Sequence, residues 1–445
     1  MFYGIGTLLS IMRINYKLLS FLGVLLFPLL LSLNLYGVST YQITMPLTFF
    51  LMLLSLYAYR NAQIFMIVII YVGLYFLYLI PHFYFGIQLS QYTLYNNNSN
   101  FEKVIFQFYL FYLGLLFNCT NLLNREKKEM SDIIFFDFKF EKRLILLILS
   151  FLLLLITYSE GTNIYRAANY YQAYTENLKV IGASCLFGVI PLFFLGFSYK
   201  NKKKRFFIIF PFVFLYCIFA ITRGTRMVLV PYIMLLFILC FDLKFKSKYI
   251  VLLCIIGFII LLLLNMVKAK IEFKVSNLLG TGVECLISHH TDMDYICCSI
   301  FGLFEDNLIS PELRFTTRIG TILESIIPPK FLPNNWKYPH AFASIIPNGG
   351  GCPMFVVLYI SFFGYIGIFY LCYFLSKFAA SLYSSKSKVK KIFIITVLIF
   401  SSRWISYDFH VILRFPIFSL ILYFFIKIVN FNTFFSTKNL THTRG

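Results

Sequence analysis

The chain has 445 residues, of which 60% are hydrophobic and 13% are charged, and its mean hydropathy is +0.79. Soluble proteins carry about 25% charged residues, so the composition excludes a soluble globular domain and indicates an integral membrane protein. The formal net charge of +21 is concentrated in polar segments between apolar runs, where lysine and arginine orient the spans and attract anionic membrane lipids. We therefore expect membrane lipids, and no nucleic acid, as partners.

Apolar runs near the length of about 20 residues that crosses a bilayer recur along the whole chain. They predict an all-α fold, a polytopic membrane helical bundle of about 12 transmembrane helices that forms one domain over residues 1–445. The eleventh run is so short that we expect Arg403 and Trp404 to lie at the membrane interface beside it. The runs are Leu18–Leu35, Gln42–Tyr59, Ile64–Ile80, Val104–Leu123, Leu144–Tyr158, Val180–Tyr199, Phe206–Thr222, Met227–Asp242, Tyr249–Val267, Pro353–Ser376, Ile392–Ser402 and Phe415–Val429.

The basic residues predict the orientation of these spans. With a cytoplasmic N-terminus, the cytoplasmic segments hold 25 of the 39 lysines and arginines, as the positive-inside rule requires. Seven of the other 14 lie in one long connection, where that rule has little force. Both termini are therefore expected in the cytoplasm. No cleavable signal peptide is expected, because Leu18 begins a full span and no small-residue cleavage site follows it.

The long connection, residues 268–352, precedes the tenth span and is predicted to be a large extracytoplasmic (periplasmic) loop. Arg314 and Arg318 stand four residues apart in it, on one helical face if the segment is helical. Each single charge, taken alone, is better explained as a solvated loop residue, but a loop this rich in charges indicates chemistry at the membrane face. Its other ionisable residues include His289, His290, Asp292, Asp294, Glu305, Asp306, Glu312, Glu324 and His340.

A second feature is the tight turn between the seventh and eighth spans, which contains Arg223, Gly224 and Arg226. Two guanidinium groups at this spacing can form a fork on the oxygens of one pyrophosphate, because their donors are planar and permanently charged. The alternative is that both arginines extend to lipid phosphates as interface anchors.

A third feature is the segment after the fifth span, where Glu160 and Arg166 stand among several tyrosines. Aromatic faces beside charged groups suit a carbohydrate. The alternative for most of the tyrosines is an aromatic belt at the headgroup level.

Metal and nucleotide chemistry are not expected. No CxxC spacing occurs, and the adjacent His289 and His290 form a poor chelate. No P-loop or dinucleotide-binding motif is present. The sequence permits a disulfide from Cys285 to Cys297 or Cys298, because the predicted exterior is oxidising.

The layout of the chain and three short motifs resemble the Wzy-type O-antigen repeat-unit polymerases of bacterial surface polysaccharide assembly. The motifs are the turn at Arg223–Arg226, the stretch PPKFLPNNWKYPH with the NGGG that follows it (residues 328–351), and FFGYIG at Phe362–Gly367. The resemblance covers nearly the whole chain in layout. The chain departs from the family at Val357–Tyr359, where members often carry a glutamate, so no acid role is assigned there.

The resemblance implies an inverting glycosyl transfer of the all-helical GT-C type at the outer face of the bacterial inner membrane, with no metal or cofactor. A growing glycan on undecaprenyl diphosphate would be passed to a new lipid-linked repeat unit, and a separate co-polymerase would help to set chain length. A departing lipid diphosphate needs fixed positive charge where negative charge develops. We therefore expect Arg223, Arg226 and Arg166 to bind the diphosphate, Arg314 and Arg318 to bind the second lipid carrier or its sugar, and Glu160 or His340 to act as the catalytic base.

Two other functions are considered. An O-antigen ligase has a similar layout and reaction, but its loop histidine motif differs from His340–Ala343. A lipid-linked oligosaccharide flippase would also be basic and would have about twelve spans, yet it should line a central cavity with charges and keep its loops short. The predicted mid-span regions are nearly free of charge, which favours the enzyme.

Overall fold

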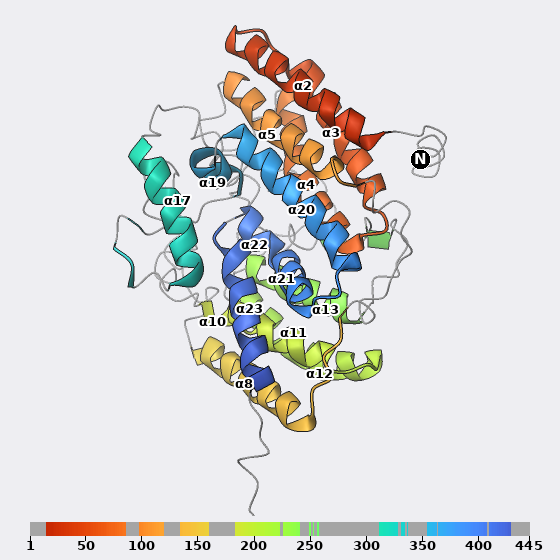
Figure 1. Ribbon diagram of the computed structural model, residues 1–445, viewed down its shortest axis with the longest axis vertical. Coiled ribbons are helices and arrows are strands. Elements are labelled where there is room, and N and C mark those ends of the chain that lie inside the picture. The colour runs from red at the N-terminus through yellow and green to blue at the C-terminus, as the bar shows by residue number, and fades with distance from the viewer. Residues whose placement is uncertain are drawn as a thin grey trace, which may run out of the picture.

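The structure of the chain is a computed structural model whose described part is helical, with no strand among the described residues. Those residues are 15–85, 98–119, 134–159, 183–222, 226–240, 249–250, 252, 256–257, 311–327, 331–333, 336, 354–362, 364–406 and 409–428. The helices labelled in Figure 1 are α2 (Tyr16–Leu35), α3 (Tyr41–Ala58), α4 (Gln63–Phe85), α5 (Asn98–Leu116), α8 (Phe140–Ser159), α10 (Ala183–Phe187), α11 (Val189–Phe197), α12 (Lys202–Thr222), α13 (Arg226–Cys240), α17 (Pro311–Ile326), α19 (Met354–Ser361), α20 (Tyr365–Ser384), α21 (Lys388–Ile399), α22 (Ser401–Ser406) and α23 (Val411–Ile428).

Two groups of helices pack side by side (Figure 1). The first group contains α2 to α5 and α20, with its most extensive contact between α5 and α20. The second contains α8, α10 to α13 and α21 to α23, in which α12 packs on α13 and α21 packs on α23. Gly114 permits the close approach of α5 to α20, because a Cβ atom there would lie 2.6 Å from the main-chain oxygen of Phe369.

Four of the described helices, α2, α3, α20 and α23, are long and apolar enough to cross a membrane. Their outer surfaces are apolar too: on α2, Leu18, Leu22 and Leu25 are each more than half exposed. Helix α8 likewise exposes Phe151 and Leu155. Water disfavours such continuous apolar surface, whereas lipid tails are a suitable solvent for it and a helix satisfies its own backbone there. The chain is therefore an all-α membrane protein.

The turn between α2 and α3 is closed by its own backbone. Gly37 has a φ of +79°, a conformation that glycine adopts without steric cost. Its N–H donates to the Asn34 carbonyl at 3.0 Å, and the next N–H donates to the Leu33 carbonyl at 3.0 Å. This is the Schellman pattern that ends many helices, so the chain turns sharply into α3.

Glu102, near the start of α5, accepts hydrogen bonds from residues in and beside this turn. It is 2% exposed, and its Oε2 accepts from Asn34 Nδ2 at 2.5 Å, Thr40 Oγ1 at 2.8 Å and the Thr40 N–H at 3.1 Å. Ser39 Oγ donates to Oε1 at 2.9 Å. Thr40 directly precedes α3, so the carboxylate also lies at the positive end of that helix dipole. Four donors replace the water that a buried carboxylate loses, and they join α2, α3 and α5.

Several predicted spans coincide with helices. The first three, the fifth, the seventh, the eighth and the twelfth agree with α2, α3, α4, α8, α12, α13 and α23 within a few residues. The fourth is displaced, since α5 covers Asn98–Leu116 and not Val104–Leu123. Most of the ninth, Tyr249–Val267, lies outside the described residues. The total of twelve spans therefore stays a prediction.

Three predicted spans are broken. The tenth, Pro353–Ser376, consists of α19 and α20, and Figure 1 shows α19 almost end-on where α20 runs obliquely across the view. Gly364 has a φ of +63° at the break. The sixth span is divided at Gly188 into α10 and α11, and the eleventh is divided at Phe400 into α21 and α22. These breaks contain apolar residues, so the length of an apolar run did not reveal them.

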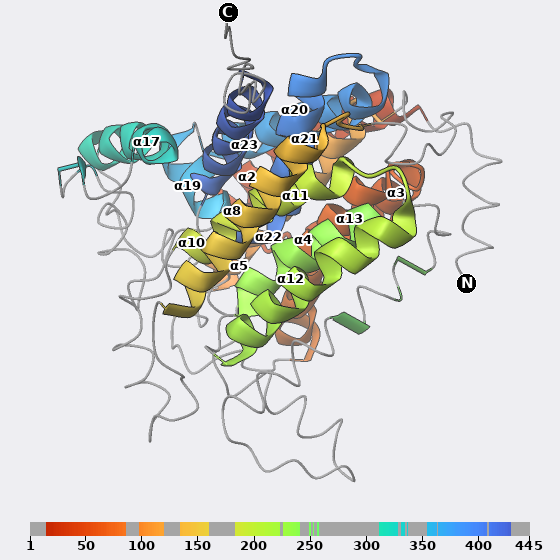
Figure 2. The same cartoon turned by 90° about the horizontal axis from the view of Figure 1, so that it is seen from below.

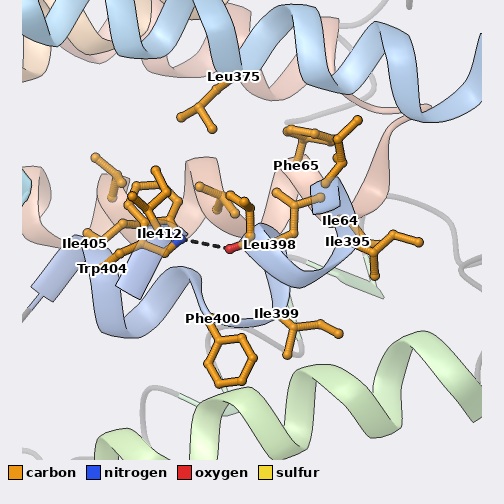
Figure 3. Close-up of a cluster of buried hydrophobic side chains, with 14 of the residues drawn as sticks. Ile64, Phe65, Leu375, Ile395, Leu398, Ile399, Phe400, Trp404, Ile405 and Ile412 are labelled. Atoms are coloured by element: carbon orange, nitrogen blue, oxygen red, sulfur yellow. Dashed lines mark hydrogen bonds between the residues drawn. The ribbon is translucent and has the colours of Figure 1, made fainter. Parts of the chain in front are cut away.

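The core where α4 and α20 to α23 meet is shown in Figure 3. Trp404 is fully buried in it, and its indole N–H donates to the Val397 carbonyl at 2.8 Å. The rings of Phe400 and Phe415 stack with centroids 3.9 Å apart. Trp404 is therefore enclosed by protein and does not face lipid, and its expected depth at the membrane interface stays a prediction. A large ring with one satisfied donor is well suited to a packed core.

Hydrogen bonds join connections that are predicted to share a side of the membrane. Lys142 Nζ donates to the Lys427 carbonyl at 3.4 Å, and both residues are predicted to be cytoplasmic. Asn34 lies at the predicted outer end of the first span, and its partner Glu102 lies in a connection that is predicted to be extracytoplasmic. Each of these two contacts thus joins helix ends that are predicted to lie on the same side of the membrane. Which end faces the cytoplasm stays a prediction, as do the one-domain interpretation and the bounds 268–352 of the loop.

Candidate functional site at the junction of α17 and α23

Helix α17 belongs to the long polar segment 268–352, and its local sequence defines both of its ends. Pro311 occupies the first helical position, where its missing N–H costs nothing. Glu312 follows in the first turn, where a negative charge is favourable. Pro328 and Pro329 follow the helix after one residue, Ile327, and the residue before a proline is disfavoured in helical conformation. The segment therefore forms a 16-residue helix.

This helix buries its polar side. Thr321, Glu324 and Ser325 are each at most 2% exposed. Among the described helices, α17 makes its main contacts with α19 and α23, and Figure 2 shows α17 at the edge of the bundle beside them. Polar groups enclosed in this way need partners, because burying them unpaired is costly.

Three hydrogen bonds fasten the end of α17 to the beginning of α23. Arg414 donates from Nε to the main-chain oxygen of Glu324 at 3.0 Å, and its Nη2 donates to the same oxygen. Ser325 Oγ donates to the main-chain oxygen of His410 at 3.0 Å. The last carbonyls of a helix attract cations, so the Arg414 guanidinium caps α17. We call Glu324, Ser325, His410 and Arg414 the Glu324 cluster.

The side chains of Glu324 and His410 form the centre of the cluster. The Glu324 Oε2 and His410 Nδ1 atoms are 4.0 Å apart, and the two side chains are 1% and 7% exposed. A histidine can gain or lose a proton near neutral pH. A carboxylate beside it stabilises the protonated ring, and such a pair can accept a proton and pass it on. The cluster therefore combines a proton acceptor with a guanidinium from a neighbouring turn of α23.

A group of three hydroxyls lies at the end of α22, four residues before His410. The Tyr71 hydroxyl is 2.6 Å from Ser406 Oγ, and the Tyr75 hydroxyl is 2.8 Å from it. Tyr75 also donates to the Tyr71 hydroxyl at 2.7 Å. These bonds join the end of α22 to α4.

The residues predicted to carry the function are mostly beyond the part of the chain that the structure describes. This holds for Glu160, Arg166, Arg223 and His340, and for Cys285, Cys297 and Cys298. Arg226 is the first residue of α13 and Arg314 lies in α17, but their side chains are not described. Arg318 is described and is partly exposed on α17. Because this segment is a helix, the condition for placing Arg314 and Arg318 on one face is met.

Sequence reasoning missed His410 and Arg414. Both stand in or beside the short connection between the last two spans. Ionisable residues so close to apolar runs indicate a functional site, so the sequence alone could have drawn attention to them. Glu324 was recognised only as one charge among many in the long loop. Its partners are 86 and 90 residues further along the chain (410 − 324 and 414 − 324), and nothing in the local pattern pairs them.

Among the described residues, no group of three or more His, Cys, Asp or Glu side chains could hold a metal ion. Comparison with known proteins identifies no relative: no protein-family model, no curated protein and no solved structure matches the chain.

Proposed function

We propose that the chain is a polymerase of lipid-linked oligosaccharides, which joins undecaprenyl-diphosphate-linked repeat units at the outer face of the bacterial inner membrane by inverting glycosyl transfer. The proposal combines the resemblance in sequence with the Glu324 cluster. It includes the finer topology of about twelve spans in a GT-C-like bundle with both termini in the cytoplasm.

One observation carries the proposal furthest. A helix from the long loop is built into the end of the membrane bundle, and its buried side brings Glu324 to within 4.0 Å of His410. A loop that only connected two spans would not need to enclose ionisable groups, because enclosing them costs free energy. An enzyme at the membrane surface needs such groups, held in fixed positions, for proton transfer.

The proposed reaction transfers the donor glycan from its lipid diphosphate to a hydroxyl of the acceptor unit. A hydroxyl of the acceptor unit attacks the anomeric carbon of the donor glycan, the bond from that carbon to the diphosphate oxygen breaks, and the lipid diphosphate leaves with the electron pair. The hydroxyl proton passes to a base. Glu160 and His340 are the base candidates from sequence, and Glu324 with His410 is added by its geometry. Arg223, Arg226 and Arg166 would stabilise the leaving diphosphate, and Arg314 and Arg318 would hold the acceptor carrier.

The described residues weigh against a flippase. The buried acidic, basic and histidine side chains among them are Glu102, Arg205, Glu324 and His410. Each lies within the first or last turns of a helix or just before one. A transporter of a charged lipid should instead place such groups near the middle of its spans.

Deletion of the gene, followed by electrophoresis of surface polysaccharide, tests the proposal. Loss of a polymerase leaves the lipid core with a single repeat unit, and plasmid-borne wild-type protein restores the ladder. Loss of every repeat unit, including the first, would point to a flippase. Unattached polymer with a bare core would point to a ligase. A complementary measurement uses purified protein in nanodiscs with lipid-linked repeat units, where a ladder and released undecaprenyl diphosphate should appear together.

A further inference from the structure

The side of α17 opposite the Glu324 cluster is apolar and exposed. Phe315, Ile322 and Ile326 are 60%, 46% and 57% exposed. Their spacing of seven and four residues places them on one side of the helix. On the segment that follows, Phe331 and Trp336 are 68% and 37% exposed.

This distribution of polar and apolar side chains is the reverse of the one expected for a helix in contact with water. A helix on the surface of a soluble domain turns its apolar side inward and its polar side outward. Helix α17 buries Thr321 and Glu324 and exposes Phe315. The exposed face therefore requires an apolar surrounding of its own.

The position of α17 indicates which surrounding this is. Helix α23 is apolar and 18 residues long, so at 1.5 Å per residue it extends for about 27 Å, close to the hydrocarbon thickness of about 30 Å. Its first turn must then lie near the edge of the hydrocarbon. Arg414 in that turn contacts Glu324 of α17, so α17 lies at the same depth. Figure 2 shows α17 at the periphery of the bundle and oblique to α8 and α23.

We infer that α17 is an interfacial helix whose Phe315–Ile322–Ile326 face is embedded in the acyl chains of the adjacent leaflet, just beneath the headgroups. Helices of this kind place their apolar face about 5–10 Å into the boundary between headgroups and acyl chains. The exposed Trp336 agrees with this depth, because tryptophan concentrates at membrane interfaces. The inference requires the membrane location of the bundle and does not depend on the reaction.

One consequence does rest on the proposed function. If the apolar face of α17 is in the leaflet, its other face holds the Glu324 cluster at the level of the headgroups. That is the depth at which the diphosphate of a lipid carrier lies, so the loop would bring its charged residues to the reacting end of the lipid.

Tryptophan fluorescence in nanodiscs tests the placement of α17 without any activity measurement. The chain has two tryptophans, and Trp404 is fully buried, so the W336F variant provides a background whose remaining tryptophan is shielded from lipid. Single reporters are then added as F315W, I322W or I326W. F151W, on the lipid-exposed side of α8, is the matched control for the middle of a span. The lipids carry bromine either near the headgroup end or near the methyl end of the acyl chain.

We expect the α17 reporters to lose more emission with bromine near the headgroups than with bromine near the methyl ends, and F151W to show the opposite order. If F151W is quenched and the α17 reporters are quenched by neither lipid, the face is covered by protein or water and the inference fails; cross-linking then shows whether a second copy covers it. Stronger quenching of the α17 reporters by the deep bromine would also contradict an interfacial helix. F315W exchanges one exposed aromatic ring for another, so a readout remains even if an isoleucine variant fails to fold.

Discussion

Arg414 of α23 donates from Nε to the main-chain oxygen of Glu324 in α17 across 3.0 Å. This bond joins the long polar loop to the last membrane helix. It uses the carbonyl of Glu324 and not its carboxylate, so the attachment of α17 and the ionisation of Glu324 can be changed separately.

Replacing Arg414 by alanine should loosen α17. The change leaves a helix-terminal carbonyl without its cap, which costs about 1–3 kcal/mol when such a group is buried. We expect a lower thermal unfolding midpoint in detergent and faster proteolysis within residues 311–327. Arg414→Lys should recover part of the loss, because it keeps the charge but not the fork of donors. Lys388→Ala, at an exposed position in α21, is the control, and equal effects of the two alanine variants would contradict the assigned role.

Replacing Glu324 by glutamine should affect activity more than stability. The variant keeps the shape of the side chain and the main-chain bond to Arg414, but removes the negative charge beside His410. If the pair takes part in proton transfer, polymer formation should fall by about 10²–10⁴-fold. The measurement is the rate of ladder formation in nanodiscs, normalised to folded protein. Ser325→Ala removes the bonds to the Thr321 and His410 carbonyls but leaves the Glu324 and His410 side chains in place, and it should retain the ladder. A normal ladder from Glu324→Gln would exclude Glu324 as the base.

Replacing Glu102 by glutamine should affect stability more than activity, which is the opposite of the result expected for Glu324. Its four donors come from Asn34, Ser39 and Thr40, and the amide end of a glutamine would face some of them with another donor. Glu102→Gln should therefore lower stability by about 1–3 kcal/mol and reduce the amount of protein in membranes. Activity per folded molecule should be unchanged. Glu141→Gln, at an exposed position in the first turn of α8, should have little effect. If both variants accumulate equally in the membrane, the hydrogen bonds by which Glu102 joins α2, α3 and α5 contribute little to stability.

Arg223 and Arg226 are the sequence-predicted diphosphate ligands, and their test is independent of the Glu324 cluster. Arg223→Ala and Arg226→Ala should each abolish long chains while membrane insertion and the single repeat unit remain. Arg223→Lys should recover little, because one ammonium group cannot reproduce two parallel hydrogen bonds. A normal ladder from the lysine variant would mean that the arginines anchor the turn at lipid phosphates instead.

The sequence was sufficient for the helical membrane class and for most helix positions, because apolar runs of membrane-spanning length are a direct consequence of bilayer thickness. It was insufficient where the backbone turns inside an apolar region, as at Phe362–Gly364 and at Phe400. The residues of those turns are as apolar as the helices around them. The burial of Trp404 was not predictable for a related reason: only the packing of α21 and α22 shows that the Val397 carbonyl accepts its N–H inside the core.

The candidate site was predictable only in part. The charges of the long loop drew attention to the segment that forms α17, and its helical state entered only as a condition for placing Arg314 and Arg318 on one face. The pairing of Glu324 with His410 and Arg414 could not, because it depends on how α17 lies across the first turn of α23. The inverted polarity of α17 was also missed, since a hydrophobic side is visible in a sequence but the direction in which it points is not.

The contact between α5 and α20 leads to a prediction about packing. A Cβ atom on Gly114 would lie 2.6 Å from the Phe369 main-chain oxygen and 2.7 Å from the Cys372 Cβ atom. Backbone cannot yield as a flexible side chain does, so Gly114→Ala should force the two helices apart at a cost of about 1–3 kcal/mol. The natural control is Gly257→Ala, because nothing lies within 4 Å of the Cβ position there. Alanine is the better helix former by about 1 kcal/mol, so the control should be neutral or stabilising. Thermal unfolding of the two purified variants should therefore show shifts of opposite sign or a shift in Gly114→Ala alone, and similar midpoints would mean that α5 and α20 are not in close contact at this position.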